Sequence, residues 1–432
     1  MEKQNARVPW LDGLKGLACL GVFTHHFMLA FFRASYFGGE APSMTASGLD
    51  TRLSYEPYGV LINGNFWVCV FLVISSFLLA AKVMRAALAE EQAGDTDASR
   101  EGNDGGSGAV PAKEPQTSRF REVVSTILLR RYPRLMLPAL AVGIGNYLLL
   151  FLLNRFRLNY IGVRTELSPL GLLLHSLVIQ WITPDTLVLG PFWMLHTLLF
   201  SSFLAVLLAI PGGKKKGFFP FLYLLLLYPF GSIDRYYTGA VWGVFLADVV
   251  VFERVKDWAF ALGLSRLLEK GFLPLRRTAG FLTVLAGLYL GGYPSYVTEP
   301  VNFYRHFGFY VHRVQSAYQI LHCLGAFLLL LGIFLWRDAF ASGEGRESKS
   351  PLLENRCSLL LGRLSFAVYL LHILWIEYLG YYLVDSLKGA LGYVPATALV
   401  YVLLLVLILL SAEGFHRSVE RVCDALCARI RG

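Results

Sequence analysis

Apolar stretches of about 20 residues recur along this chain, and they constrain its fold more than any other feature. A helix needs about 20 apolar residues to cross the ~30 Å hydrocarbon core of a bilayer. Only helices and closed barrels satisfy all backbone hydrogen-bonding groups in that core. Charged residues make up 16% of the chain, below the ~25% of soluble domains. The sequence therefore predicts an all-α, polytopic integral membrane protein.

Ten stretches are predicted to span the membrane: 9–32, 59–81, 133–153, 191–211, 218–232, 237–252, 279–294, 319–336, 359–384 and 396–415. An eleventh apolar segment, residues 169–183, is short for a crossing at 1.5 Å per residue, so we expect it to be re-entrant or interfacial. With the N- and C-termini both cytoplasmic, most Lys and Arg residues fall in inner loops. The net charge of +9 is then typical of cytoplasmic loops and not of nucleic-acid binding.

The chain shows no internal repeat, so residues 1–432 are predicted to form a single transmembrane domain. Between the second and third spans, the segment 86–120 is polar and rich in glycine. Such a composition buries too little apolar surface to offset the entropy of ordering. We expect this segment to be a disordered cytoplasmic loop.

The first span, WLDGLKGLACLGVFTHHFMLAFF, contains ionisable residues that cost roughly 2.5–3.5 kcal/mol each near a bilayer centre. Lys15 and His26 are eleven positions apart, which places them within about 20° on a helical wheel and about 16 Å apart along the axis. Asp12 precedes Lys15 by one turn and can pair with it. His26 either satisfies a buried carbonyl or, as a neutral imidazole, takes a proton from a hydroxyl near pH 7.

Three arginines, Arg130, Arg131 and Arg134, lie at the predicted inner start of the third span, in LRRYPRLMLP. One interpretation is cationic anchoring on the cytoplasmic side. The other is a phosphate site, because arginine forks match phosphate geometry and a helix N-terminus favours anions. Coenzyme A or a nucleotide would suit such a site, and no P-loop or dinucleotide-binding glycine pattern competes for the role.

Five phrases of the sequence resemble motifs of the acyltransferase-3 family of integral-membrane O-acyltransferases, in the family's order: LDGLKGLACLGVFTHHF, VFLVISSFLLA, RRYPRLMLP, FWML and LGRLSFAVYLLH. The first phrase aligns the family's histidine with His26. Three positions depart from the pattern. Lys15 replaces the usual arginine, Ser76 replaces a glycine, and Leu198 stands where many members have glutamate.

The resemblance implies transfer of an acyl group, commonly acetyl from acetyl-CoA, to a hydroxyl of a glycan or other extracytoplasmic molecule. It implies that His26 acts as the base, with Lys15 paired to Asp12 or bound to a coenzyme oxygen. It implies no metal and no permanently bound cofactor, since acyl-CoA is a co-substrate. Arg131 and Arg134 would hold the coenzyme phosphates, and Arg130 would lie beside them.

Further residues of these motifs are predicted to line the substrate path: Trp193, Ser75, Ser76, Tyr369 and His372. Ser75 or Ser76 either carries a transient acyl group or allows close helix packing. Trp193 either packs or shapes the cavity. His372 is equally well explained by buried structural hydrogen bonding.

Two other classes of protein remain as alternatives. A transporter or flippase for a polysaccharide or acylated precursor would use intramembrane charges as a relay. A non-catalytic scaffold would not explain why Lys15 and His26 share one face, or stripe, of the helix in the first span. For the enzyme, the expected partners are the lipid bilayer, acyl-CoA and the hydroxyl acceptor, and the expected location is a bacterial inner or cell membrane. The oligomeric state stays open, with a homodimer among the alternatives.

Overall fold

The computed structural model describes residues 8–101, 119–159, 167–184, 186–211, 220–297, 302–307, 317–337 and 350–430. Across these ranges the chain forms helices joined by turns, without a β-strand. Seven helices are long and apolar enough to cross a membrane. The prediction of an all-α, polytopic membrane protein is confirmed.

The helices that meet these criteria lie within seven segments: Pro9–Phe31, Gly64–Gln92, Phe120–Arg155, Gly190–Ala209, Tyr318–Trp336, Arg356–Leu391 and Tyr393–Ala428. They correspond to α1 (Pro9–Phe31), α4 (Gly64–Glu101), α5 (Arg119–Arg155), α8 (Trp193–Ala209), α14 (Ala317–Trp336), α15 (Arg356–Trp375) with α16 (Tyr381–Leu391), and α17 (Tyr393–Phe415) with α18 (Arg421–Ala428). The other three predicted spans coincide with the helices α9 (Pro220–Ile233), α10 (Tyr237–Val251) and α12 (Leu273–Gly291). Whether these three cross the membrane stays a prediction.

Shorter helices connect the long ones. Between α1 and α4 lie α2 (Ala34–Phe37), α3 (Leu49–Leu53) and a 3₁₀ turn (Pro57–Leu61), and α11 (Arg254–Ala261) follows α10. The predicted re-entrant segment contains α6 (Pro169–Leu174), a π-helical turn (His175–Ile179) and α7 (Gln180–Ile182). At 1.5 Å per residue this run extends about 21 Å, which is short of the ~30 Å core and agrees with an incomplete crossing.

The segment 86–120 is not disordered throughout, because α4 continues to Glu101. Its sequence after Arg85, AALAEEQ, consists of strong helix formers, so the helix continues past the apolar run of the second predicted span. Residues 102–118 lie outside the described part of the chain. The third span also begins earlier than predicted, since α5 starts at Arg119 and contains Pro133 in its interior.

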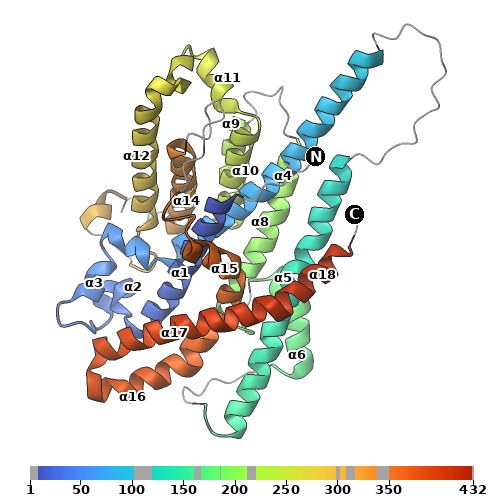
Figure 1. Ribbon diagram of the computed structural model, residues 1–432. Helices are drawn as coiled ribbons and strands as arrows, with labels where there is room; N and C mark the ends of the chain where they lie inside the picture. The colour runs from blue at the N-terminus through green and yellow to red at the C-terminus, as the bar shows by residue number, and fades with distance from the viewer. Residues whose placement is uncertain are drawn as a thin grey trace.

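Close packing around α1 positions the functional residues, because α1 contacts both α4 and α15. At the contact with α15, a Cβ added to Gly362 would lie 2.0 Å from the carbonyl oxygen of Asp12. A Cβ added to Gly16 would lie 2.6 Å from the backbone nitrogen of Gly362. Glycine at these positions therefore lets the two helix backbones touch, which holds the start of α1 against α15 (Figure 1).

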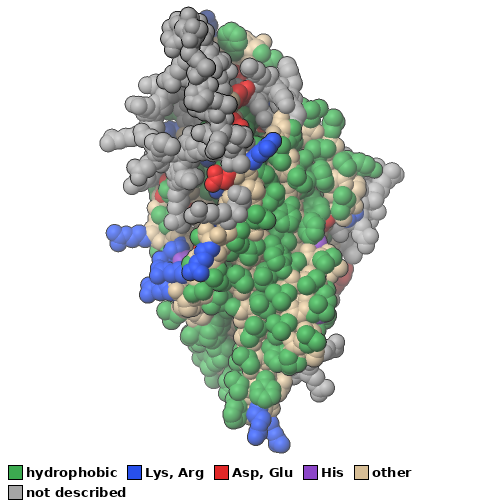
Figure 2. Space-filling model, turned by 90° about the vertical axis from the view of Figure 1, so that its right-hand side faces the viewer, with side chains coloured by type: hydrophobic (Ala, Val, Ile, Leu, Met, Phe, Trp, Pro, Cys, Tyr) green, Lys and Arg blue, Asp and Glu red, His purple; other side chains and the backbone are tan. Residues whose placement is uncertain are grey.

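The outer surface of the molecule matches a lipid environment. Figure 2 shows a broad face of apolar side chains, with Lys and Arg gathered toward its edges. The helix α17 contributes several exposed apolar side chains: Leu399, Val402, Leu403, Val406 and Leu410. Apolar patches of this extent are rare on soluble monomers and are typical of contact with hydrocarbon.

Candidate active site

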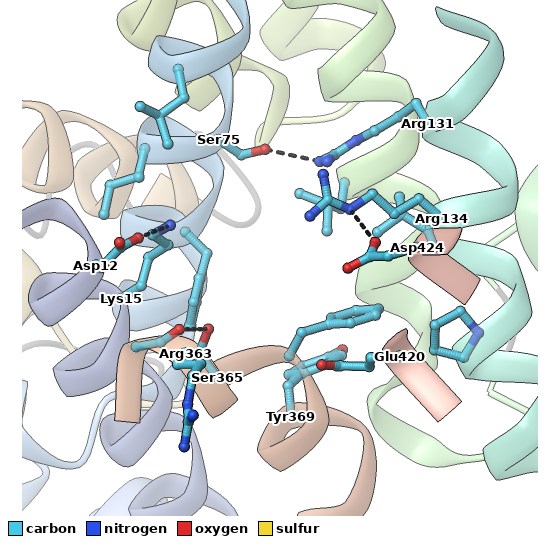
Figure 3. Close-up of a pocket in the computed structure, with 18 of the residues that line it drawn as sticks. Asp12, Lys15, Ser75, Arg131, Arg134, Arg363, Ser365, Tyr369, Glu420 and Asp424 are labelled. Carbon is cyan, nitrogen blue, oxygen red and sulfur yellow. Dashed lines mark hydrogen bonds and ion pairs between the residues drawn. The ribbon is translucent and has the colours of Figure 1, made fainter. Parts of the chain in front are cut away.

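A cavity of about 590 Å³ opens between α1, α4, α5, α8, α15 and the C-terminal helices, and we call it the inner cavity (Figure 3). Its polar and charged lining residues are Asp12, Lys15, Ser75, Arg131, Arg134, Arg363, Ser365, Tyr369, His416, Glu420 and Asp424. The start of α1 and the C-terminal helices α17 and α18 meet here.

Lys15 and Asp12 form the ion pair that the sequence predicted. The Lys15 Nζ lies 2.7 Å from Asp12 Oδ1, one helical turn away on α1. The exposed fractions of these side chains are 25% and 13%, so the pair borders the cavity without being sealed from it. Figure 3 shows Lys15 across the cavity from the arginines of α5.

Arg131 points into the inner cavity and is held by two hydroxyl groups (Figure 3). Its Nε donates to Ser202 Oγ at 2.8 Å, and its Nη2 donates to Ser75 Oγ at 2.9 Å. Within the described part of the chain, no carboxylate pairs with this guanidinium. Because hydroxyl groups orient the fork without neutralising it, Arg131 keeps a full positive charge for an anion.

The other cations of the inner cavity carry counter-charges. Arg134 Nε lies 3.3 Å from Asp424 Oδ1, and Arg363 Nη2 lies 2.7 Å from Glu413 Oε2. Lys15 is likewise paired, with Asp12. Among the Lys and Arg side chains that line the inner cavity, Arg131 is therefore the one that forms no ion pair with a carboxylate of the described residues.

Arg130 does not line the inner cavity, contrary to its predicted role in cofactor binding. Its side chain donates instead to the carbonyl oxygens of Ile430 at 2.8 Å and Ala428 at 3.1 Å. Nor do the three arginines lie at a helix N-terminus, since α5 begins at Arg119. The helical stretch before Pro133 contains good helix formers, and the argument from a helix N-terminus is wrong for this cluster.

The two serines of α4 have different surroundings. Ser75 lines the inner cavity and orients Arg131, a role that the sequence did not indicate. Ser76 is buried and does not line the inner cavity. A Cβ added to Gly243 of α10 would lie 2.7 Å from the Ser76 Cβ, so Ser76 lies at a close contact between α4 and α10 that glycine at position 243 allows.

A second cavity, of about 510 Å³, contains His26 and is called the outer cavity here. Its polar and aromatic lining residues are His25, His26, Asn65, Trp193, Thr197, Asp234, Arg235, Tyr236, Tyr296, Tyr318, Gln319 and Tyr369. The Trp193 and Tyr236 rings pack with their centroids 5.3 Å apart. Trp193 therefore packs against Tyr236 and lines this cavity.

His26 stands between two other imidazoles. Its ring centroid lies 5.0 Å from that of His25 and 4.9 Å from that of His372. The Nδ1 of His25 forms a hydrogen bond with the Ile62 carbonyl oxygen at 3.1 Å. The Nδ1 of His372 forms one with the Tyr369 carbonyl oxygen at 2.7 Å. Both neighbours are thus held by backbone acceptors, whereas His26 lines the outer cavity. His372 is buried and lines neither cavity, which favours the structural interpretation of that residue.

Tyr369 lines both cavities and lies where they meet. Its hydroxyl donates to the carbonyl oxygen of Pro191, just before α8. On the α1 stripe between Lys15 and His26, the Cys19 thiol packs against the Ser365 carbonyl at 3.3 Å. The role of His26 as the base for a thioester held by Arg131 and Arg134 implied one shared cavity. The structure instead divides the space in two, because packed side chains separate His26 from the arginines.

Several lining residues of the outer cavity were not anticipated. Asp234 accepts hydrogen bonds from the Tyr236 amide at 3.0 Å and from Thr197 Oγ1 at 3.4 Å. Asn65 accepts a hydrogen bond from the Tyr236 hydroxyl at 3.3 Å. Asp234 could have been found from the sequence, because it is an acid in the short connection between two apolar segments. Asn65 and Gln319 lacked such a signal, since single amides at helix ends are common.

The fold and the two opposed cavities define a helical membrane protein with one polar site toward each end of the bundle. Residues 8–412 match the family model described as an acyltransferase domain. The chain belongs to the acyltransferase-3 family and is a multi-pass membrane acyltransferase. Neither the curated proteins nor the solved structures gave a match.

Proposed function

We propose that the chain transfers an acyl group, most simply acetyl, from cytoplasmic acyl-CoA to a hydroxyl of a cell-surface or exported glycan. The observation that carries this proposal is the pair of cavities meeting at Tyr369, with Arg131 in one and His26 in the other. A donor and an acceptor that enter from opposite sides of a membrane need such an arrangement.

The inner cavity suits the donor. Coenzyme A carries several phosphate charges, and Arg131 offers a guanidinium that no described carboxylate neutralises. Lys15 lies across the same cavity and supports binding of an anionic ligand. With the phosphates held near α5, the pantetheine arm extends toward Tyr369 and brings the thioester to the junction of the cavities.

The outer cavity suits an acceptor rich in hydroxyl groups. Its aromatic rings offer stacking surfaces, and the side chains of Asn65, Gln319 and Asp234 offer hydrogen-bonding groups. A sugar presents both an apolar face and several hydroxyls, so a glycan fits this lining better than a purely apolar molecule. The location follows from the two substrates, with the donor cytoplasmic and the acceptor outside a cell membrane.

In the proposed reaction, the acceptor oxygen attacks the thioester carbonyl as His26 removes its proton. The new C–O bond forms, the C–S bond breaks, and the proton passes from the imidazole to the departing coenzyme thiolate. General-base catalysis of this kind contributes typically about 10²–10⁴-fold. The thioester is already activated, so positioning supplies much of the remainder.

The test compares membranes that contain the wild-type chain, His26→Gln or His196→Gln. Labelled acetyl-CoA is supplied on the cytoplasmic side, and label is followed into surface carbohydrate. His196 is the matched control because it lies on α8, outside both cavities, with its Nδ1 bonded to the Trp181 carbonyl. We expect a loss of at least about 100-fold for His26→Gln.

If the His26→Gln protein transfers label at the wild-type rate and at equal protein levels, the proposed function is wrong. Loss of glycan export with intact acyl transfer would favour the transporter interpretation, which two opposed cavities also permit.

A further inference from the structure

The helical run of α17 and α18 forms one side of the inner cavity, and the residues with which it lines the cavity lie beyond the family match, which ends at residue 412. A π-helical turn, His416–Glu420, joins α17 to α18, so that Tyr393–Ala428 forms one helical run. Figure 1 shows this run slanting across the molecule to α5, and α18 contacts α5 directly. Four of its residues line the cavity and are called the C-terminal wall: His416, Glu420, Cys423 and Asp424.

This wall brings two carboxylates to the phosphate-binding side of the cavity. Asp424 Oδ1 lies 3.3 Å from Arg134 Nε, and the exposed fractions of the two side chains are 55% and 63%. Figure 3 shows the Asp424 carboxylate turned toward Arg134, next to Arg131. An ion pair this exposed contributes little to stability, so an incoming anion can displace it readily.

The second carboxylate, Glu420, is more enclosed. Its Oε2 lies 2.5 Å from His416 Nδ1, and its side chain is 12% exposed. Its Oε1 is buried without a hydrogen-bond partner among the described residues. An acid with one free oxygen in a cavity that receives phosphates repels them at close range.

From these contacts we infer that the C-terminal wall sets the affinity for the acyl donor: Asp424 occupies Arg134 as a displaceable counter-ion, and Glu420 adds repulsion. This inference rests on the proposed function, since it assumes coenzyme A in the inner cavity. When the coenzyme binds, a phosphate oxygen replaces the Asp424 carboxylate on the guanidinium. When the thiol product leaves, the carboxylate returns, which favours release of the spent coenzyme.

The experiment titrates coenzyme A into the purified full chain by calorimetry and compares wild type, Asp424→Asn, Glu420→Gln and Asp424→Glu. We expect Asp424→Asn and Glu420→Gln each to lower the Kd about three- to fivefold, equivalent to about 0.6–1 kcal/mol. Asp424→Glu keeps the charge and should bind as the wild type does. The gain should shrink between 50 mM and 300 mM salt because exposed charges are screened.

Asp385→Asn is the matched control, since it removes an equivalent exposed acid, paired with Lys388 on α16, outside the inner cavity. If Asp424→Asn binds coenzyme A no more tightly than wild type, or if Asp385→Asn gains equally, the inference is overturned. The proposed function fails separately if the wild-type chain does not bind coenzyme A at all.

Discussion

The hydroxyl of Tyr369 donates a hydrogen bond to the carbonyl oxygen of Pro191 at the point where the inner and outer cavities meet. This bond ties α15 to the turn that precedes α8. It also fixes an aromatic ring between the proposed donor and acceptor spaces. In the proposed reaction, this ring would shield the thioester from water in the outer cavity.

Tyr369→Phe keeps the ring and removes this hydrogen bond. We expect a loss of about 1 kcal/mol in stability, and up to roughly fivefold more acyl-CoA hydrolysis without acceptor, because the ring is no longer anchored. Release of the coenzyme thiol measures the hydrolysis. Tyr401→Phe is the control, since it loses a comparable bond to Thr24 at 2.8 Å outside both cavities. Equal hydrolysis by the two variants would show that the Pro191 bond has no such role.

Arg131 and Arg130 are adjacent in sequence, and the structure predicts opposite outcomes for their substitution. Arg131→Gln should weaken coenzyme A binding by roughly 10–100-fold, since a charge-assisted hydrogen bond contributes about 1.5–3 kcal/mol. Arg131→Lys should lie between, because lysine keeps the charge but loses the fork that contacts Ser75 and Ser202. Titration calorimetry measures all three proteins.

Arg130→Gln is the matched control for this measurement. It removes the same charge from the same turn of α5, but its side chain contacts the C-terminal carbonyl oxygens outside the cavity. We expect its Kd to stay within about twofold of wild type. Equal loss of affinity by both variants would show that the effect comes from positive charge in this region generally, and that Arg131 is not a specific contact of the coenzyme.

The sequence predicted what depends on local pattern. Apolar runs placed the long helices, and the spacing of Asp12 and Lys15 predicted their ion pair. Helix ends were less accurate, because α4 continues through AALAEEQ, a stretch of high helix propensity, and α5 begins 14 residues before the predicted start of the third span. Local pattern also marked Arg131 and Arg134 as partners for an anion, and both line the inner cavity.

Features that depend on packing between distant segments were not predicted. The contact of Asp424 with Arg134 requires α17 and α18 to cross the molecule to α5, and no local signal encodes that crossing. The division into two cavities depends on the side chain of Tyr369 and on the approach of Pro191. A helical wheel places Lys15 and His26 on one stripe, but it cannot say what fills the space between them.

The contact of Gly362 with α1 gives a prediction about how the site is assembled. Gly362→Ala places a methyl group 2.0 Å from the Asp12 carbonyl oxygen, so the helices must separate and shift Lys15. We expect a loss of about 1–3 kcal/mol in stability and weaker coenzyme binding. Gly389→Ala is the control, since nothing lies within 4 Å of its Cβ and it should gain about 0.5–1 kcal/mol. Thermal unfolding in detergent distinguishes the two, and a stable Gly362→Ala protein would contradict close backbone contact.

The loop between α1 and α4 gives a prediction about pH. Asp50 is 1% exposed, and its carboxylate accepts hydrogen bonds from Ser43 Oγ at 2.5 Å, the Met44 amide at 2.7 Å and Thr45 Oγ1 at 2.7 Å. Burial alone would raise the pKa of Asp50, but these hydrogen bonds together lower the pKa below its ordinary value. The ionised form is therefore favoured by folding.

Because the pKa of Asp50 is lower in the folded chain than in the unfolded chain, its contribution is fully present above the unfolded value of about 3.9. It is lost as the pH falls through the folded pKa. Asp50→Asn should therefore destabilise the protein by about 1–2 kcal/mol at pH 7, and this difference from wild type should shrink below about pH 4. Thermal unfolding of both proteins at pH 7, 5 and 3.5 measures it. Glu56→Gln serves as the control, since the structure gives its side chain no hydrogen bond within the described residues. A difference between wild type and Asp50→Asn that stays constant over this pH range would contradict a role for the ionised carboxylate.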